Sequence, residues 1–122
     1  MVSKTLIYNG FINMQDSGEA MDIVFLGNSQ TPLAEILQDE ISGHQVSARY
    51  YISDTEKDLN QVQVDFIKQL SGEVEAEYLD HYSEITGYLW TDENLQIGGH
   101  DLMAEIKSNA GKYLNLIIDI ND

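Results

Sequence analysis

Alternating hydrophobic and polar residues predict two β-strands at the start of the chain. The alternation runs over residues 4–14, where Gly10 suits a β-bulge, and residues 20–27 are apolar enough for a largely buried strand. The apolar side of the first strand is formed by Leu6, Tyr8, Ile12 and Met14. Residues 15–19 are polar and contain a glycine, so we expect a hairpin turn between the two strands.

Apolar residues spaced three and four apart then predict a helix that begins at Thr31-Pro32. A threonine side chain can accept a backbone hydrogen bond at the N-cap, and proline fits the first helical position. The apolar stripe of this helix is formed by Leu33, Ile36, Leu37 and Ile41. Gly43 suits the end of the helix, and alternation resumes over residues 45–53. The inward side of that strand is formed by Val46, Ala48, Tyr50 and Ile52.

Two more helices are predicted further along. One is capped by Asp54 or Thr55 and ends at Gly72, and the other begins at Gly98–Asp101 and ends at Gly111. The stripe of the first is formed by Leu59, Val62, Phe66 and Leu70, with Ile67 beside it. The second carries Leu102, Met103, Ile106 and Ala110. Both stripes have the spacing of amphipathic helices.

Three further strands complete the pattern. Residues 73–80 and 84–90 are predicted to form a second hairpin with a turn near residues 80–83, and a polar loop follows over residues 91–94. The last strand covers residues 112–120. Its buried side is formed by Leu114, Leu116, Ile118 and Ile120.

The order ββαβ-α-ββαβ predicts an α+β fold, in which about three helices cover one face of a mainly antiparallel sheet. Residues 46–54 align with residues 114–122, and each of these runs follows a helix and a glycine. The likeness indicates an internal duplication, although two amphipathic strands can also look alike by chance. No linker separates the halves, so we expect residues 1–122 to form a single acidic domain.

The charge of the chain narrows the choice of partner. It has 21 Asp and Glu against 6 Lys and Arg, a formal net charge of -15. A small domain is usually comfortable at a net charge of about 2–8 in magnitude. Such a chain repels nucleic acids and anionic membranes and attracts a basic protein surface. A halophilic host or a simple need for solubility would also account for this acidity.

Composition excludes several classes of protein. The chain has no cysteine, which rules out disulfides, zinc–thiolate sites and thiol nucleophiles. No apolar run approaches the roughly 20 residues of a membrane-spanning helix, and we expect no signal peptide. We therefore expect a cytoplasmic protein that contacts no membrane.

Three alternating glutamates form the sharpest surface feature. In a strand, Glu73, Glu75 and Glu77 would share one face at a spacing of roughly 6.6 Å and resemble a stretch of phosphate backbone. Val74, Ala76 and Tyr78 would then face the core. We assign partner binding to these glutamates and to the acids and aromatics around them, which are Asp80, Tyr82, Glu84, Tyr88, Trp90, Asp92 and Glu93. The simpler interpretation is a strand face that only needs to be polar.

No catalytic or cofactor motif is evident. The three histidines, His44, His81 and His100, do not have HExxH spacing, and Gly98-Gly99-His100-Asp101 lacks the phosphate-loop patterns, so a helix cap explains it better. We expect neither catalytic residues nor a cofactor or metal. An enzyme or small-ligand module whose histidines and carboxylates converge from separate strands remains the alternative.

The sequence therefore favours a non-enzymatic acidic protein that occupies a basic, nucleic-acid-binding surface of a partner. Phage anti-defence inhibitors and immunity proteins of nuclease toxins share this physical logic. Such a protein would not bind nucleic acid itself. A third hypothesis is an assembly component that forms a homodimer through a bare strand edge.

Overall fold

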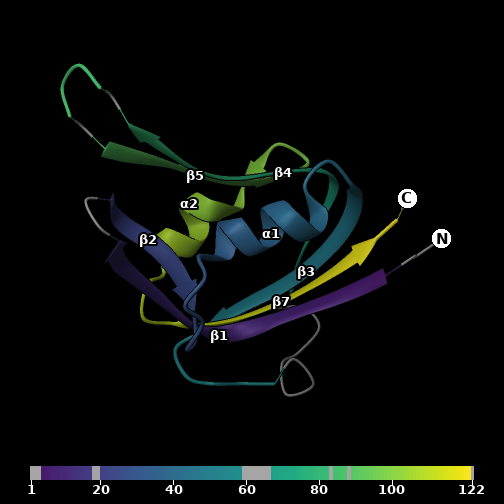
Figure 1. Ribbon diagram of the computed structural model, residues 1–122. Helices are drawn as coiled ribbons and strands as arrows, with labels where there is room; N and C mark the ends of the chain where they lie inside the picture. The colour runs from purple at the N-terminus through teal and green to yellow at the C-terminus, as the bar shows by residue number, and fades with distance from the viewer. Residues whose placement is uncertain (1–3, 18–19, 59–66, 83, 88, 122) are drawn as a thin grey trace.

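The computed structural model describes residues 4–17, 20–58, 67–82, 84–87 and 89–121 (Figure 1). Its elements are β1 (Lys4–Ser17), β2 (Ala20–Leu26), α1 (Leu33–Ile41), β3 (Gln45–Ser53), β4 (Lys68–Tyr82), β5 (Leu89–Ile97), β6 (His100–Asp101), α2 (Leu102–Lys107) and β7 (Tyr113–Ile120). The described strands form a sheet in the order β2-β1-β7-β3-β4-β5-β6, and every described pair is antiparallel. The α+β class and the mainly antiparallel sheet are confirmed.

The sheet curls around the two helices. In Figure 1, α1 and α2 lie between the β4–β5 hairpin on one side and β3, β7 and β1 on the other. The helices cover the concave face with fully buried side chains, which are Leu33, Leu37, Ile41, Leu102 and Ile106. Burying each such side chain stabilises the fold by about 1.5–3 kcal/mol.

Two long strands make this curl possible by changing partners midway. β1 pairs with β7 along residues 4–11 and with β2 from Ile12 onward. β4 pairs with β3 along residues 68–73 and with β5 from Val74 onward. The change falls beside a glycine in each strand, Gly10 in β1 and Gly72 in β4.

At each of these two positions the backbone of a second glycine passes very close to the strand, which we call a glycine crossing. A Cβ atom added to Gly72 would lie 2.6 Å from the Cα of Gly98, and one added to Gly10 would lie 2.8 Å from the backbone nitrogen of Gly27. Both distances are shorter than any real contact of a Cβ atom. Gly10 and Gly72 also have φ of +152° and +136°, which side chains other than glycine rarely adopt. We conclude that the two bends require glycine.

The two halves of the chain share one pairing pattern. Gly10 pairs with Leu114 in β7, and Gly72 pairs with Val46 in β3, the two positions that the sequence aligns. The same offset recurs in backbone hydrogen bonds, from Gly111 N–H to the Ile12 carbonyl at 2.8 Å and from Gly43 N–H to the Val74 carbonyl at 2.9 Å. β3 and β7 pair with each other, with Arg49 opposite Ile117 at the centre of this pseudo-twofold arrangement.

The second predicted helix is wrong where the structure describes it. Lys68 and Leu70 belong to β4, and Leu70 pairs with Ala48 of β3, while residues 59–66 lie outside the described residues. The apolar stripe was misleading because Leu70 also fits the alternation of a strand that faces the core. The described residues contain two helices, not three.

Two local predictions also need correction. Thr31 does not cap α1, because its N–H donates to Ser29 Oγ at 3.2 Å and Pro32 occupies the cap position. The turn of the second hairpin lies at residues 84–86 instead of 80–83, and residues 91–94 belong to β5 instead of a loop. Within this polar run, Asp92 and Asn94 lie on the outer face of β5, and Glu93 between them faces inward.

The glycine crossing gives a test of the fold. We expect Gly72→Ala to lower the free energy of unfolding by about 3 kcal/mol, since the new Cβ would overlap backbone atoms and the residue would be strained. Gly43→Ala is the matched control, because a Cβ there meets no atom within 4 Å although φ is also positive, +86°. Its cost should stay near 1 kcal/mol. Urea denaturation of both variants measures the difference, and equal midpoints would contradict the crossing.

Candidate partner-binding surface

Glu73, Glu75 and Glu77 project to solvent from one face of β4, as predicted, and we call these three residues the acidic ladder. Val74 and Ala76 between them are buried. The two sets separate because side chains of a strand alternate between its faces. A slip of one residue would bury three carboxylates, which fixes the register firmly.

Both edges of the acidic ladder are anchored. β5 pairs along one edge and places Gln96 opposite Glu75 and Asn94 opposite Glu77. On the other edge β3 has ended, and side chains from the C-terminal part of α1 take its place. The N–H of Ala76 donates to Ser42 Oγ at 3.3 Å, and the N–H of Tyr78 donates to the Gln38 side chain.

The acidic ladder also lines a shallow groove of about 290 Å³. Ser42, Gly43 and Asn94 complete the walls of this groove. Among the described residues no ion pair involves the acidic ladder, although four of the lysines pair with carboxylates elsewhere. The three carboxylates are therefore exposed, held by a regular backbone and not neutralised by a neighbouring cation.

The outer face of the hairpin continues beyond the acidic ladder with one apolar residue and one acid. Leu79, two residues after Glu77, is 49% exposed and lies opposite the exposed Asp92. The turn carries the exposed Glu84 and, next to it, Ile85, which is 97% exposed. In Figure 1 this end of the hairpin projects from the body of the molecule.

The exposed Leu79 and Ile85 were missed by sequence reasoning, which looked for aromatic anchors. The alternation of β4 contained the signal for Leu79, because it shares the parity of Glu77. The side chains of the predicted aromatic anchors fall outside what the structure describes. Tyr88 lies outside the described residues, as do the side chains of Asp80, Tyr82 and Trp90, whose backbones belong to β4 and β5.

Glu93 does not belong to the partner-binding surface, and this prediction is wrong. Its side chain is 2% exposed, and it pairs across the hairpin with Tyr78 on the inner face. One carboxylate oxygen accepts the N–H of Val24 in β2 at 3.0 Å. The other lies 2.8 Å from the Lys107 ammonium, a close ion pair outside hydrogen-bond geometry.

Glu93 thereby joins the two ends of the curled sheet. β2 is the edge strand at one end, and β5 lies near the other end. The buried carboxylate accepts a hydrogen bond from the backbone of β2 at the edge away from β1, where no described strand is paired. It also leaves that edge less available for the strand pairing that a homodimer through a bare edge would use.

The two histidines whose side chains the structure describes, His44 and His100, have different local surroundings. His44 precedes β3, and its carbonyl accepts the N–H of Val74 at 3.0 Å. The side chain of His81 lies outside the described residues. His100 Nε2 lies 3.0 Å from Glu105 Oε1, far along the chain from the other two. Among the described residues no group of three or more His, Cys, Asp or Glu side chains is arranged to hold a metal ion.

Glu105 forms the centre of a polar cluster that links both halves. Tyr50 donates to its Oε1 at 2.9 Å, and Lys68 donates to its Oε2 at 2.8 Å. Burial alone would raise the pKa of Glu105, but the hydrogen bonds from Lys68, Tyr50 and His100 outweigh it, and the pKa is lowered. Burial and this carboxylate raise the pKa of Tyr50. Because its members satisfy one another, we assign the cluster a structural role.

Comparison with known proteins adds no functional information. The chain matches no family model, no curated protein and no solved structure. In the part of the chain that the structure describes, no helix has the length and apolar character needed to cross a membrane.

The buried position of Glu93 gives a second test. We expect Glu93→Ala to lower the free energy of unfolding by about 2 kcal/mol, because it leaves the buried N–H of Val24 without an acceptor and Lys107 without its partner. Glu75→Ala, a change of the same kind on the same hairpin, should alter it by less than about 0.5 kcal/mol. Thermal or urea unfolding compares the two. If both variants are as stable as the wild type, Glu93 does not hold the sheet together.

Proposed function

We propose that this protein is a non-enzymatic acidic binding protein. It occupies a basic surface that a partner otherwise uses to bind nucleic acid, as inhibitors of defence nucleases and immunity proteins of nuclease toxins do. The observation that carries the proposal is the acidic ladder, three exposed carboxylates at regular spacing with no cation beside them in the described residues. A net charge of -15 reinforces their field.

The likeness of the two halves supports this interpretation. We infer that the chain arose by internal duplication of a ββαβ unit, since the pairings and the glycine crossings recur at equivalent positions. By this equivalence the ladder positions correspond to Phe11, Asn13 and Gln15 of β1, none of which is charged. The same local fold is therefore built without the carboxylates. Their presence in one half is explained better by binding than by folding.

The surroundings of the acidic ladder suit a protein partner. Lysine and arginine side chains of a groove that binds nucleic acid are spaced to meet successive phosphates, and successive strand carboxylates offer a comparable row. The exposed Leu79 and Ile85 lie on the same hairpin and supply apolar contact area. Charge complementarity would mainly speed association, and apolar contacts would slow dissociation.

The equivalence of the halves supplies the test variant. Glu75→Asn with Glu77→Gln installs the residues found at the same positions of β1, so we expect the fold to be retained. The immobilised wild-type protein is used to capture partners from a lysate of the host cell, and the captured protein is then purified. The double variant should associate with it about tenfold more slowly at low salt.

A matched control removes the same charge elsewhere. Glu56→Gln with Asp58→Asn lies on the exposed segment after β3, away from the β4–β5 hairpin (Figure 1), and it should leave the association rate within about twofold of wild type when both variants are compared at the same salt concentration. If the ladder variant binds as fast as the wild type, or if the control slows binding equally, the acidic ladder is only a solvated face.

The nucleic-acid-mimic form of the proposal makes a separate prediction. The protein should compete with double-stranded DNA or RNA for its partner and should bind neither alone. Fluorescence anisotropy of a labelled duplex measures both, with the partner present and absent. A ternary complex of partner, duplex and this protein would contradict the mimic and leave a general binding role intact.

A further inference from the structure

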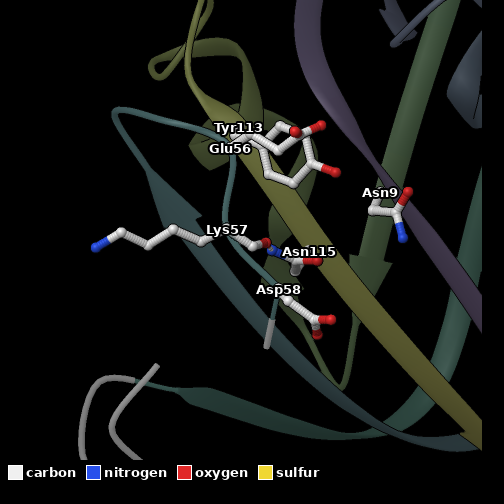
Figure 2. Close-up of a pocket in the computed structure, with 6 residues that line it drawn as sticks. All are labelled: Asn9, Glu56, Lys57, Asp58, Tyr113 and Asn115. Carbon is white, nitrogen blue, oxygen red and sulfur yellow. Dashed lines mark hydrogen bonds between the residues drawn. The ribbon is translucent and has the colours of Figure 1, made fainter. Parts of the chain in front are cut away.

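A second candidate site lies on the convex face, away from the acidic ladder. A pocket of about 320 Å³ is formed where the segment after β3 passes over β1 and β7 (Figure 2). Its lining residues are Asn9, Glu56, Lys57, Asp58, Tyr113 and Asn115. We propose that this pocket binds an organic cation that carries a guanidinium or primary ammonium group. The proposal is independent of the function proposed above.

The segment that carries the two carboxylates is held in place by side chains beneath it. Asn115 is only 5% exposed, and its Nδ2 donates to the carbonyl of Lys57. Ser53 Oγ donates to the carbonyl of Thr55 at 2.7 Å. Figure 2 shows the Lys57 side chain extending away from the pocket, whereas Glu56 lies beside Tyr113 and Asp58 lies near Asn115. The acids therefore face the pocket, and the cation of the segment does not.

Tyr113 is the observation that points to a ligand. This side chain is 8% exposed, and its ring packs edge-on against Phe11 with 5.0 Å between the ring centroids. Its hydroxyl makes no hydrogen bond to any described residue and is directed into the pocket (Figure 2). Burial, Glu56 and Asp58 all raise the pKa of Tyr113. The ring is buried while the hydroxyl opens onto the pocket, so a ligand that binds there can take the place of water as its hydrogen-bond partner.

The groups around the pocket determine the class of ligand. The carboxylates of Glu56 and Asp58 only accept hydrogen bonds, and Asn115 uses its Nδ2 on the backbone, which leaves its carbonyl oxygen for a ligand. A guanidinium has five N–H donors and an ammonium has three, so either can bind several of these oxygens at once. Among the described residues no three His, Cys, Asp or Glu side chains are arranged to hold a metal ion, so an organic cation fits these two carboxylates better than Ca²⁺ does.

The pocket is a feature of one half only. By the equivalence of the two halves, Asn9, Tyr113 and Asn115 correspond to Ser71, Gln45 and Ser47. That corresponding face has Arg49 beside the serines, and the carboxylate that lines its pocket, Asp119, belongs to β7. The fold does not require the acceptors of the first pocket, which favours a role for them in binding.

The experiment is a titration of the full-length, ¹⁵N-labelled protein with propylguanidinium and, separately, butylammonium. We expect saturable shifts of the side-chain amide signals of Asn9 and Asn115. Glu56→Gln with Asp58→Asn should abolish saturable binding. Tyr113→Phe keeps the ring and removes only the hydroxyl, and it should weaken binding about tenfold, as expected for a lost hydrogen bond to a charged group.

Two controls separate a site from general attraction to an acidic protein. Asp39→Asn with Glu40→Gln removes the same charge outside the pocket and should leave the dissociation constant within about twofold. Butanol, which lacks the charge, should shift neither amide. The proposal is overturned if this variant weakens binding as much as the pocket variant, if Ca²⁺ produces the same saturable shifts, or if neither cation saturates.

Discussion

The close crossing of two pairs of glycines is the constraint on which the rest of this structure depends. Where Gly72 meets Gly98 and Gly10 meets Gly27, one strand passes another at a distance that no side chain permits. Each long strand can then leave one partner and continue with another. The sheet therefore curls around α1 and α2 instead of remaining open, and the outer face of β4 is presented to solvent from Glu73 to Leu79.

Curling the sheet brings its two ends together and encloses polar groups between them. Glu93 and Lys107 provide the partners that these groups need. A free strand edge has unpaired N–H groups, and a buried one must find acceptors. Glu93 provides an acceptor for Val24, and Lys107 compensates the charge that is buried as a result. With only six basic residues in the chain, cations used in this way are not available to neutralise surface acids. The exposed charge of the acidic ladder is partly a consequence of this distribution.

Local periodicity predicted most of the fold, because alternation and helical spacing record which side of an element is buried. The strand over residues 45–53 was placed at its observed ends, and α1 was placed within a residue or two. Periodicity failed where one pattern fitted two structures. Leu70 suits a helical stripe and a strand, and only its pairing with Ala48, which is distant in sequence, selects the strand.

For the candidate site too, local patterns predicted some features correctly and missed others. The exposure of the acidic ladder followed from alternation alone, whereas Glu93 was misassigned because its neighbours suggested a loop. Its burial depends on β2, which lies some seventy residues earlier in the chain and meets β5 only after the sheet has curled. The pocket beside Tyr113 had no local signal at all. It is assembled from β1, β7 and the segment after β3, and no single stretch of sequence contains more than three of its residues.

The equivalence of the two halves separates what the fold needs from what it tolerates. Glycines at the crossings and apolar residues on the inner face occur in both halves, so selection for folding explains them. The outer faces differ. One half has Phe11, Asn13 and Gln15 where the other has three glutamates, and one has Tyr113 and Asn115 where the other has Gln45 and Ser47. Residues that differ between equivalent positions are not required by the backbone arrangement that the two halves share. In this chain those differences coincide with the acidic ladder and with the pocket, so the two halves present different surfaces on one shared pairing pattern.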